Sequence, residues 1–203
     1  ADPAVLTIAR IFGGAEFQAE QWARHLSDRH RVVVVTRRNA AGEPPRERRG
    51  GFEVVRLPVS GVPWLRTVLD LRRIERAVRS ADPVPQVTLC FQTFVSGYAG
   101  VRLQKRLGIP AVVWVRGEDE YRITRARTGR LSVPVWNAAA GVLVQSESNR
   151  DRVLEAVRHF RPRAEAEIAR KLEVVPNGID LPDLSTAANA AALGEAPGGR
   201  GGI

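Results

Sequence analysis

Two adjacent glycines near the start of the chain are the first residues whose types could do chemistry. Gly13 and Gly14 lie in the stretch IFGGAE at residues 11–16, between an apolar run and a helical pattern. Glycines at such a turn let the backbone approach a ligand, and the following helix points free N–H groups and a partial positive charge at it. The pattern therefore predicts a phosphate site. The alternative is that both glycines only form a tight turn between a strand and a helix.

Other nucleotide-binding motifs are missing from the sequence. Neither the dinucleotide fingerprint G-x-G-x-x-G nor a P-loop occurs, and the second apolar run ends in residues 36–38, Thr-Arg-Arg, without the acidic residue that holds an NAD ribose. An NAD enzyme is therefore disfavoured, whereas Arg37 and Arg38 leave an NADP 2′-phosphate open as an alternative.

Residues for metal-dependent or nucleophilic catalysis are also missing. The sequence contains no Ser-His-Asp set, zinc-ligand spacing or paired carboxylates of a hydrolase, so we expect no metal site. Cys90 lies in an apolar run and is interpreted as a small buried hydrophobe, with a catalytic thiol as the alternative. We interpret the histidines as structural because they lie away from the predicted carboxyl ends of strands; they are His25, His30 and His159.

Strand-like runs that alternate with helical patterns must position these residues. The alternation predicts a Rossmann-like three-layer αβα domain with a mainly parallel, seven-stranded sheet. The predicted strands are residues 5–9, 31–36, 52–57, 86–91, 111–115, 141–145 and 172–175. The first helix should pack on the sheet through one apolar stripe, formed by Ala15, Ala19, Trp22, Ala23 and Leu26. Residues 39–51 are rich in Gly, Pro and Arg, lack an apolar period and predict a loop.

Length, composition and charge limit the class of protein and the kinds of ligand that the chain can bind. The chain has 203 residues, 44% of them hydrophobic, which fits one α/β domain, and neither a spanning apolar run nor a signal peptide is found, so we expect a cytoplasmic protein. The net charge of +9 suits phosphate-bearing substrates, anionic lipid or nucleic acid. We expect no nucleic acid, because the aromatic residues, 6% of the chain, are spread through apparent core runs. A basic nucleic-acid-binding α/β domain is the less favoured alternative.

Three segments occur in an informative order: residues 12–16 before an amphipathic helix, the run HRVVVVT at 30–36, and VVPNGID at 174–180. Together they resemble the N-terminal half of a family 4, GT-B-fold retaining glycosyltransferase. The resemblance implies transfer of a sugar from a nucleoside diphosphate sugar to a glycan, lipid or small-molecule acceptor, with no cofactor besides the donor. The alternative is a Rossmann-type binding module without catalysis.

The resemblance also implies a division of the chain. Residues 4–180 would form the acceptor-side domain, and residues 181–203 a linker and the start of a missing C-terminal, donor-binding domain. The isolated chain would then be inactive, because the residues that stabilise the leaving diphosphate belong to that second domain. Gly13 and Gly14 would face the donor diphosphate. Glu16 would bind the acceptor or, alternatively, stabilise the first turn of its helix.

The loop at residues 116–122, after the fifth predicted strand, resembles the segment that approaches the reacting sugar. Carboxyl ends of strands are where α/β sheets bind ligands. We therefore predict acceptor-binding roles for Arg116, Glu118 and Tyr121 and a catalytic role for Asp119, with a solvated charged turn as the alternative. Many relatives carry a histidine here, and this chain does not, so we do not expect a histidine-based mechanism.

The predicted helix at residues 64–80 bears on where in the cell the protein is found. Its core stripe would comprise Trp64, Val68, Leu71, Ile74 and Val78. Leu65 and Leu69 fall instead among the arginines of the opposite side, an arrangement that suits docking on an anionic membrane surface, such as the inner face of the cell membrane. The alternative is a broadly buried helix whose arginines extend outward.

Overall fold

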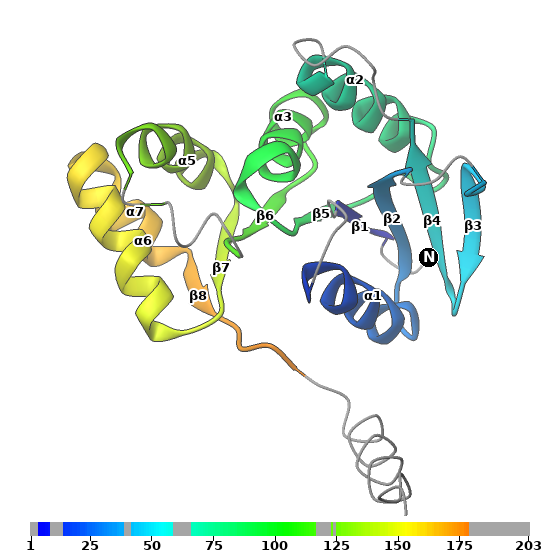
Figure 1. Cartoon of the computed structure of the whole chain (residues 1–203), viewed down its shortest axis with the longest axis horizontal. Coiled ribbons are helices and arrows are strands. Elements are labelled where there is room, and N and C mark those ends of the chain that lie inside the picture. The colour runs from blue at the N-terminus through cyan, green and yellow to red at the C-terminus, as the bar shows by residue number, and fades with distance from the viewer. Residues whose placement is uncertain are drawn as a thin grey trace, which may run out of the picture.

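The structure, a computed structural model, describes residues 4–8, 14–38, 42–58, 66–116, 123 and 125–178. A single sheet forms the middle layer, and helices cover it on both sides (Figure 1). The predicted Rossmann-like αβα class is confirmed. No helix in the described ranges has the length and apolar character needed to cross a membrane.

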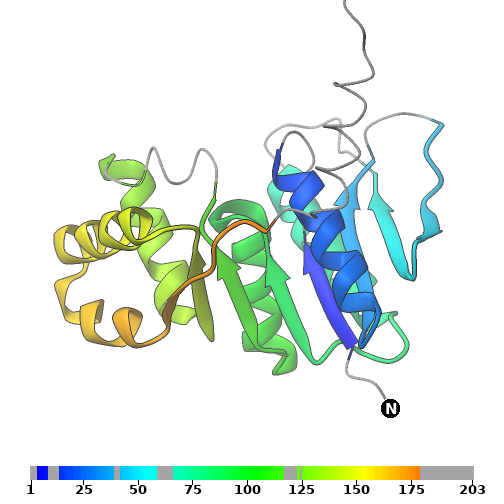
Figure 2. The same ribbon diagram turned by 90° about the horizontal axis from the view of Figure 1, so that it is seen from below.

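The sheet contains eight strands within the described residues. They are β1 (Ala4–Ile8), β2 (Arg31–Arg37), β3 (Arg46–Arg49), β4 (Phe52–Leu57), β5 (Val87–Cys90), β6 (Ala111–Trp114), β7 (Gly141–Val144) and β8 (Leu172–Val174). Their order is β3-β4-β2-β1-β5-β6-β7-β8, and neighbouring strands are parallel except for the antiparallel pair β3 and β4. The seven parallel strands are those predicted from the sequence. Their carboxyl ends lie along one edge of the sheet (Figure 2).

Helices connect the strands. They are α1 (Gly14–Ser27), α2 (Arg66–Arg79), α3 (Tyr98–Leu107), α5 (Ala126–Ala138), α6 (Glu147–Phe160) and the short α7 (Glu165–Arg170), with an irregular turn η1 (Thr93–Gly97) and a 3-10 turn η2 (Pro162–Ala164). The helix α6 begins where Ser146 caps it, because the Ser146 side chain accepts a hydrogen bond from the Asn149 backbone N–H at 3.2 Å.

The two faces of the sheet carry different sets of helices. On one face, side chains of α2, α3, α5, α6 and α7 form a large core with strand residues such as Val35, Val113 and Val144. On the other face, α1 packs against β2 and β4 through Ala23 and against β5 and β6 through Ala19. Ala19 and Ala23 are 2% and 0% exposed, so this part of the predicted α1 stripe is confirmed. Trp22 and Leu26 are partly buried beside them.

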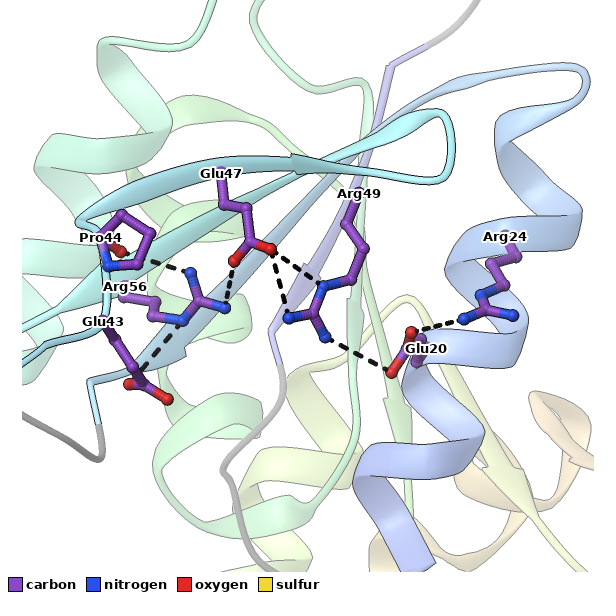
Figure 3. A network of polar contacts seen from close by, with 7 residues as sticks. All are labelled: Glu20, Arg24, Glu43, Pro44, Glu47, Arg49 and Arg56. Atoms are coloured by element: carbon purple, nitrogen blue, oxygen red, sulfur yellow. Dashed lines mark hydrogen bonds and ion pairs between the residues drawn. The ribbon is translucent and has the colours of Figure 1, made fainter.

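The strand β3 corrects the prediction that residues 39–51 form a loop. Its four residues are all charged, so no apolar period reveals it, and ion pairs hold it in place (Figure 3). Arg56 of β4 is 7% exposed and contacts Glu47 of β3 at 2.6 Å, and Arg49 of β3 lies 3.8 Å from Glu20 of α1. The hydrogen bond from Arg56 is the main cause of the lowered pKa of Glu47. The network therefore links β4, β3 and α1.

The helix α2 differs from its predicted pattern in two ways. Val68, placed in the core stripe from the sequence, is 46% exposed, whereas Ile74 and Val78 are buried as predicted. Two acidic residues of the same helix are buried instead: Asp70 and Glu75 are 2% and 8% exposed. The helix therefore buries carboxylates that pair with arginines of neighbouring elements.

The carboxylate of Glu75 should make the stability of the folded chain depend on pH. Burial acts to raise its pKa, but hydrogen bonds from Arg106 at 2.9 Å and Arg102 at 3.2 Å outweigh burial, so the pKa lies below the ordinary value of 4.5. The contribution of this carboxylate is therefore complete above pH 4.5 and is lost as the pH falls through the folded-state pKa. We expect Glu75→Gln to lower the melting temperature at pH 7 by roughly 5 °C. The difference from wild type should shrink below pH 4.5.

The measurement is thermal unfolding, followed by circular dichroism between pH 3 and pH 7. Glu155→Gln on α6 is the matched control, because Glu155 is an exposed glutamate. A wild-type-to-Glu75→Gln difference that stays constant across this pH range would contradict the prediction.

Candidate functional site

The described site residues meet at the carboxyl edge of the sheet. α1 begins at Gly14, after β1 has ended at Ile8, and Arg116 lies two residues beyond the end of β6. Only β5 separates β1 from β6, so the carboxyl ends of these two strands are about 10 Å apart. Gln18 of α1 and Arg116 bond to the consecutive residues Gly178 and Asn177, which places the N-terminal part of α1 near Arg116.

The other predicted site residues are not placed. Gly13, Glu118, Asp119 and Tyr121 lie outside the described residues, and for Glu16 the structure describes the helix backbone only. Their assignments to the donor diphosphate, the acceptor and catalysis stay predictions.

Arg116 is buried at this edge, with 3% of its surface exposed. Its Nη2 donates to Oδ1 of Asn177 at 2.5 Å. When the Gln145 amide is oriented to satisfy its neighbours, its oxygen accepts from Nη2 and Nε of Arg116 at 3.0 and 2.6 Å. The guanidinium also lies over the rings of Trp114 and Phe91, at 4.5 and 5.6 Å from their centroids. Stacking and hydrogen bonds together hold the cation in one orientation.

The segment after β8 crosses this edge toward α1. The Val175 N–H donates to the carbonyl of Val144 at 2.8 Å, and Nε2 of Gln18 donates to the carbonyl of Gly178 at 3.0 Å. Sequence reasoning missed Gln18, Gln145 and Asn177 as parts of this arrangement. Gln18 could have been found from its position, because it lies between Ala15 and Trp22 on the side of α1 that the sequence predicts to face the sheet. Asn177 lies in the PNG motif that had already been singled out.

A strained turn follows β5 at the same edge. Val95 has φ 59° and ψ −65°, a conformation that a β-branched residue rarely adopts and that costs about 1–3 kcal/mol. Hydrogen bonds hold the turn: the Ser96 hydroxyl donates to the Gln92 carbonyl at 2.8 Å, and the Trp136 indole donates to the Thr93 hydroxyl at 2.9 Å. This segment, between β1 and β6, is therefore a rigid part of the edge.

The end of β2 carries further charged groups. Arg37 is paired with the buried Asp70 of α2. Thr36, on the face that packs against α1, is 7% exposed, and its hydroxyl has no hydrogen-bond partner in the structure. The ion pair means that one of the two arginines considered for an NADP phosphate is already held by a carboxylate.

Cys90 is a buried core residue, His25 and His30 lie in α1 and in the turn after it, and His159 lies in α6. Burial raises the pKa of the Cys90 thiol to about 12, and the side chain is 0% exposed, as expected for a small core residue. His25 and His30 line a groove formed by α1, the turn that follows it and the segment containing Pro176 and Gly178. Among the residues that the structure describes, no group of three or more His, Cys, Asp or Glu side chains could hold a metal ion.

Three solved structures with this fold are about twice as long as the chain. Alr3699/HepE from Anabaena, solved in complex with UDP-glucose, is 16% identical with a TM-score of 0.63, and the match covers 94% of this chain and 50% of that one. Sucrose-phosphate synthase from Thermosynechococcus elongatus is 13% identical with a TM-score of 0.62, covering 92% and 52%. UDP-N-acetylglucosamine 2-epimerase from Rickettsia bellii is 10% identical with a TM-score of 0.63, covering 96% and 50%.

These likenesses define the fold class: a Rossmann-like α/β domain that corresponds to about half of each of these proteins. A search of curated protein sequences returned no match. The family model of Glycosyltransferase Family 4 matches residues 12–182, and the chain belongs to this family.

Proposed function

We propose that the chain forms the acceptor-side domain of a glycosyltransferase. The enzyme would move a sugar from a nucleoside diphosphate sugar to a glycan, lipid or small-molecule acceptor with retention of configuration. The family match over residues 12–182 carries this proposal. The UDP-glucose complex of Alr3699/HepE, which shares the fold, supports a nucleotide-sugar donor. The proposal includes no metal and no cofactor besides the donor.

The start of α1 supplies the donor side of the proposed site. Gly14 is the first residue of this 14-residue helix, so its backbone N–H belongs to the unpaired N–H groups at the positive end of the helix dipole. Together with Gly13, it would face the donor diphosphate. A glycine there leaves room for phosphate oxygens to reach the backbone.

The acceptor side would be formed by Glu16, Glu118 and Tyr121, with Asp119 beside the reacting sugar. These assignments rest on the family resemblance and on the place of residue 116 at the carboxyl end of β6. For Arg116 itself, the buried guanidinium supports an indirect contribution to the acceptor side.

The test of the proposed function separates binding from transfer. Because the chain corresponds to about half of the similar solved structures, we expect it by itself to show weak or no binding of UDP- and GDP-sugars in calorimetry, and no transfer. In the protein with both domains, Gly14→Val should abolish transfer, because its side chain would fill the space next to the diphosphate. A melting curve of the variant distinguishes misfolding from a site effect. Transfer that survives the substitution would show that the glycines form only a turn.

The second proposal concerns peripheral attachment to an anionic membrane through α2. One side of this helix exposes an apolar residue and three arginines: Val68, Arg72, Arg76 and Arg79. They are three or four residues apart, so their side chains lie next to one another on the helix surface. Leu69, which the sequence placed on the membrane side, is half-buried, so Val68 is the better apolar candidate. Cations and an apolar side chain on one face support docking on anionic headgroups.

We expect the chain to bind vesicles that contain phosphatidylglycerol more tightly than vesicles of phosphatidylcholine alone, and to release them as salt screens the charges. Val68→Ser should weaken binding several-fold. Leu131→Ser on α5 is the matched control, because Leu131 is 45% exposed and Val68 is 46% exposed. Binding that neither variant weakens would indicate a nonspecific effect of net charge, and equal losses for both variants would indicate no preference for α2. Either result would contradict docking through α2.

A further inference from the structure

The segment from Val175 to Gly178 spans a large part of the sheet with few residues. It starts beside β7, where Val175 bonds to Val144, and ends beside α1, where Gln18 holds the Gly178 carbonyl. Three residue steps reach at most about 10 Å in an extended chain. The segment therefore connects the β7 edge to α1 in only three residue steps.

Three different elements hold this crossing segment. The backbone of β7 holds its start, the Arg116 side chain after β6 bonds to Asn177 at 2.5 Å, and Gln18 of α1 holds its end at 3.0 Å. Val175 also packs against the cluster that contains Phe91 and Trp114, the two rings on which Arg116 lies. The charged donor makes the Asn177 contact the strongest of the three hydrogen bonds.

We propose that Arg116 is a positioning residue: through Asn177 it fixes the direction in which the chain leaves the sheet after β8. Gly178, at the end of this segment, is thereby held next to α1. The amide of Gln145 and the aromatic rings keep the guanidinium in place, and Gln18 completes the path. The contacts by which Arg116 holds the crossing segment all lie among the described residues. The consequence of these contacts for sugar transfer rests on the proposed function.

The consequence is that the direction of the crossing segment sets where a second domain begins. In a transferase whose donor and acceptor sides lie on two domains, the distance between the reacting groups depends on this starting direction. A misplacement of about 1 Å can cost about a hundredfold in rate. Loosening the Asn177 contact should therefore lower kcat more than it raises the KM for the donor, because the donor-binding residues themselves stay intact.

Asn177 is the residue to change, because it is exposed and its loss leaves the core intact. In Asn177→Ala, hydrogen exchange of the Val175 amide should become about tenfold faster, as the loss of a hydrogen bond to a charged group predicts. The free energy of unfolding should fall by no more than the corresponding amount, about 1.4 kcal/mol, because Gln145 still accepts from the buried guanidinium. In Asn177→Asp, the carboxylate still accepts from Arg116, and exchange should stay at or below the wild-type rate. Asn149→Ala, which removes a partly exposed amide on α6, is the matched control.

The exchange measurement on the 203-residue chain decides the inference without any transfer assay. Equal exchange in wild type and Asn177→Ala would overturn it, as would equally fast exchange in the Ala and Asp variants. Faster exchange that the Asp variant restores would support it. If the exchange results agree with the inference while the protein with both domains transfers no sugar, the positioning role stands and the proposed function fails.

Discussion

Gly129→Ala is expected to lower the free energy of unfolding by about 3 kcal/mol. A Cβ atom at position 129 would overlap the ring of Phe160 and lie 2.7 Å from the carbonyl oxygen of Ile123. Neither neighbour can move freely, because Ile123 is 1% exposed and Phe160 packs against the large core at the end of α6. Alanine is the better helix former by about 1 kcal/mol, and this gain is too small to offset the overlap.

The measurement is urea unfolding of both proteins, followed by circular dichroism. Gly141→Ala in β7 is the matched control, because a Cβ atom there would lie 3.6 Å from the nearest atom, a Val112 methyl group, which is ordinary contact. Its unfolding free energy should change by less than about 1 kcal/mol. A Gly129→Ala protein as stable as wild type would show that α5 and α6 can separate without cost.

The second large effect concerns Cys90 and Gly100, which lie against each other where α3 packs on β5. Gly100→Ala alone should cost about 2 kcal/mol, because its Cβ atom would overlap the Sγ of Cys90, which is 0% exposed. Cys90→Ala alone should cost about 1 kcal/mol through lost contacts. The double variant moves a methyl-sized group from the strand to the helix, so its stability should come close to wild type.

A double-mutant cycle by urea unfolding measures this coupling. Combining Cys90→Ala with Gly129→Ala is the control, because these two sites belong to different contacts and their costs should add. Additive costs for Cys90→Ala and Gly100→Ala would contradict the prediction.

Sequence patterns predicted the parallel part of the fold because several of its strands bury continuous apolar runs. Residues 31–36 and 111–115 show this most clearly, since five residues of β2 and the whole stretch of β6 except Val112 are buried. The strand β3 could not be predicted in this way, because charged side chains rather than apolar burial hold it. For the same reason the burial of Asp70 and Glu75 in α2 was missed: their arginine partners lie on distant elements.

The candidate site was predictable only where local sequence determines it. The start of α1 at Gly14 and the position of Arg116 after β6 follow from adjacent strands and helices. The partners of Arg116 do not, because Asn177 is 61 residues away along the chain. Gln18 and Gly178 are 160 residues apart. Such contacts depend on strand order and on the path of the crossing segment, which no local period encodes.

The charged strand β3 also decides how far the sheet can grow. An edge strand exposes unpaired N–H and C=O groups that can add a strand from another molecule, and natural proteins prevent this addition with charged side chains or with very short edge strands. Here β3 places four charged residues on one edge, and the opposite edge, β8, is three residues long. Both edges therefore resist intermolecular β-pairing. The ion pairs that fasten β3 to Arg56 and Glu20 thus also protect the folded chain against aggregation.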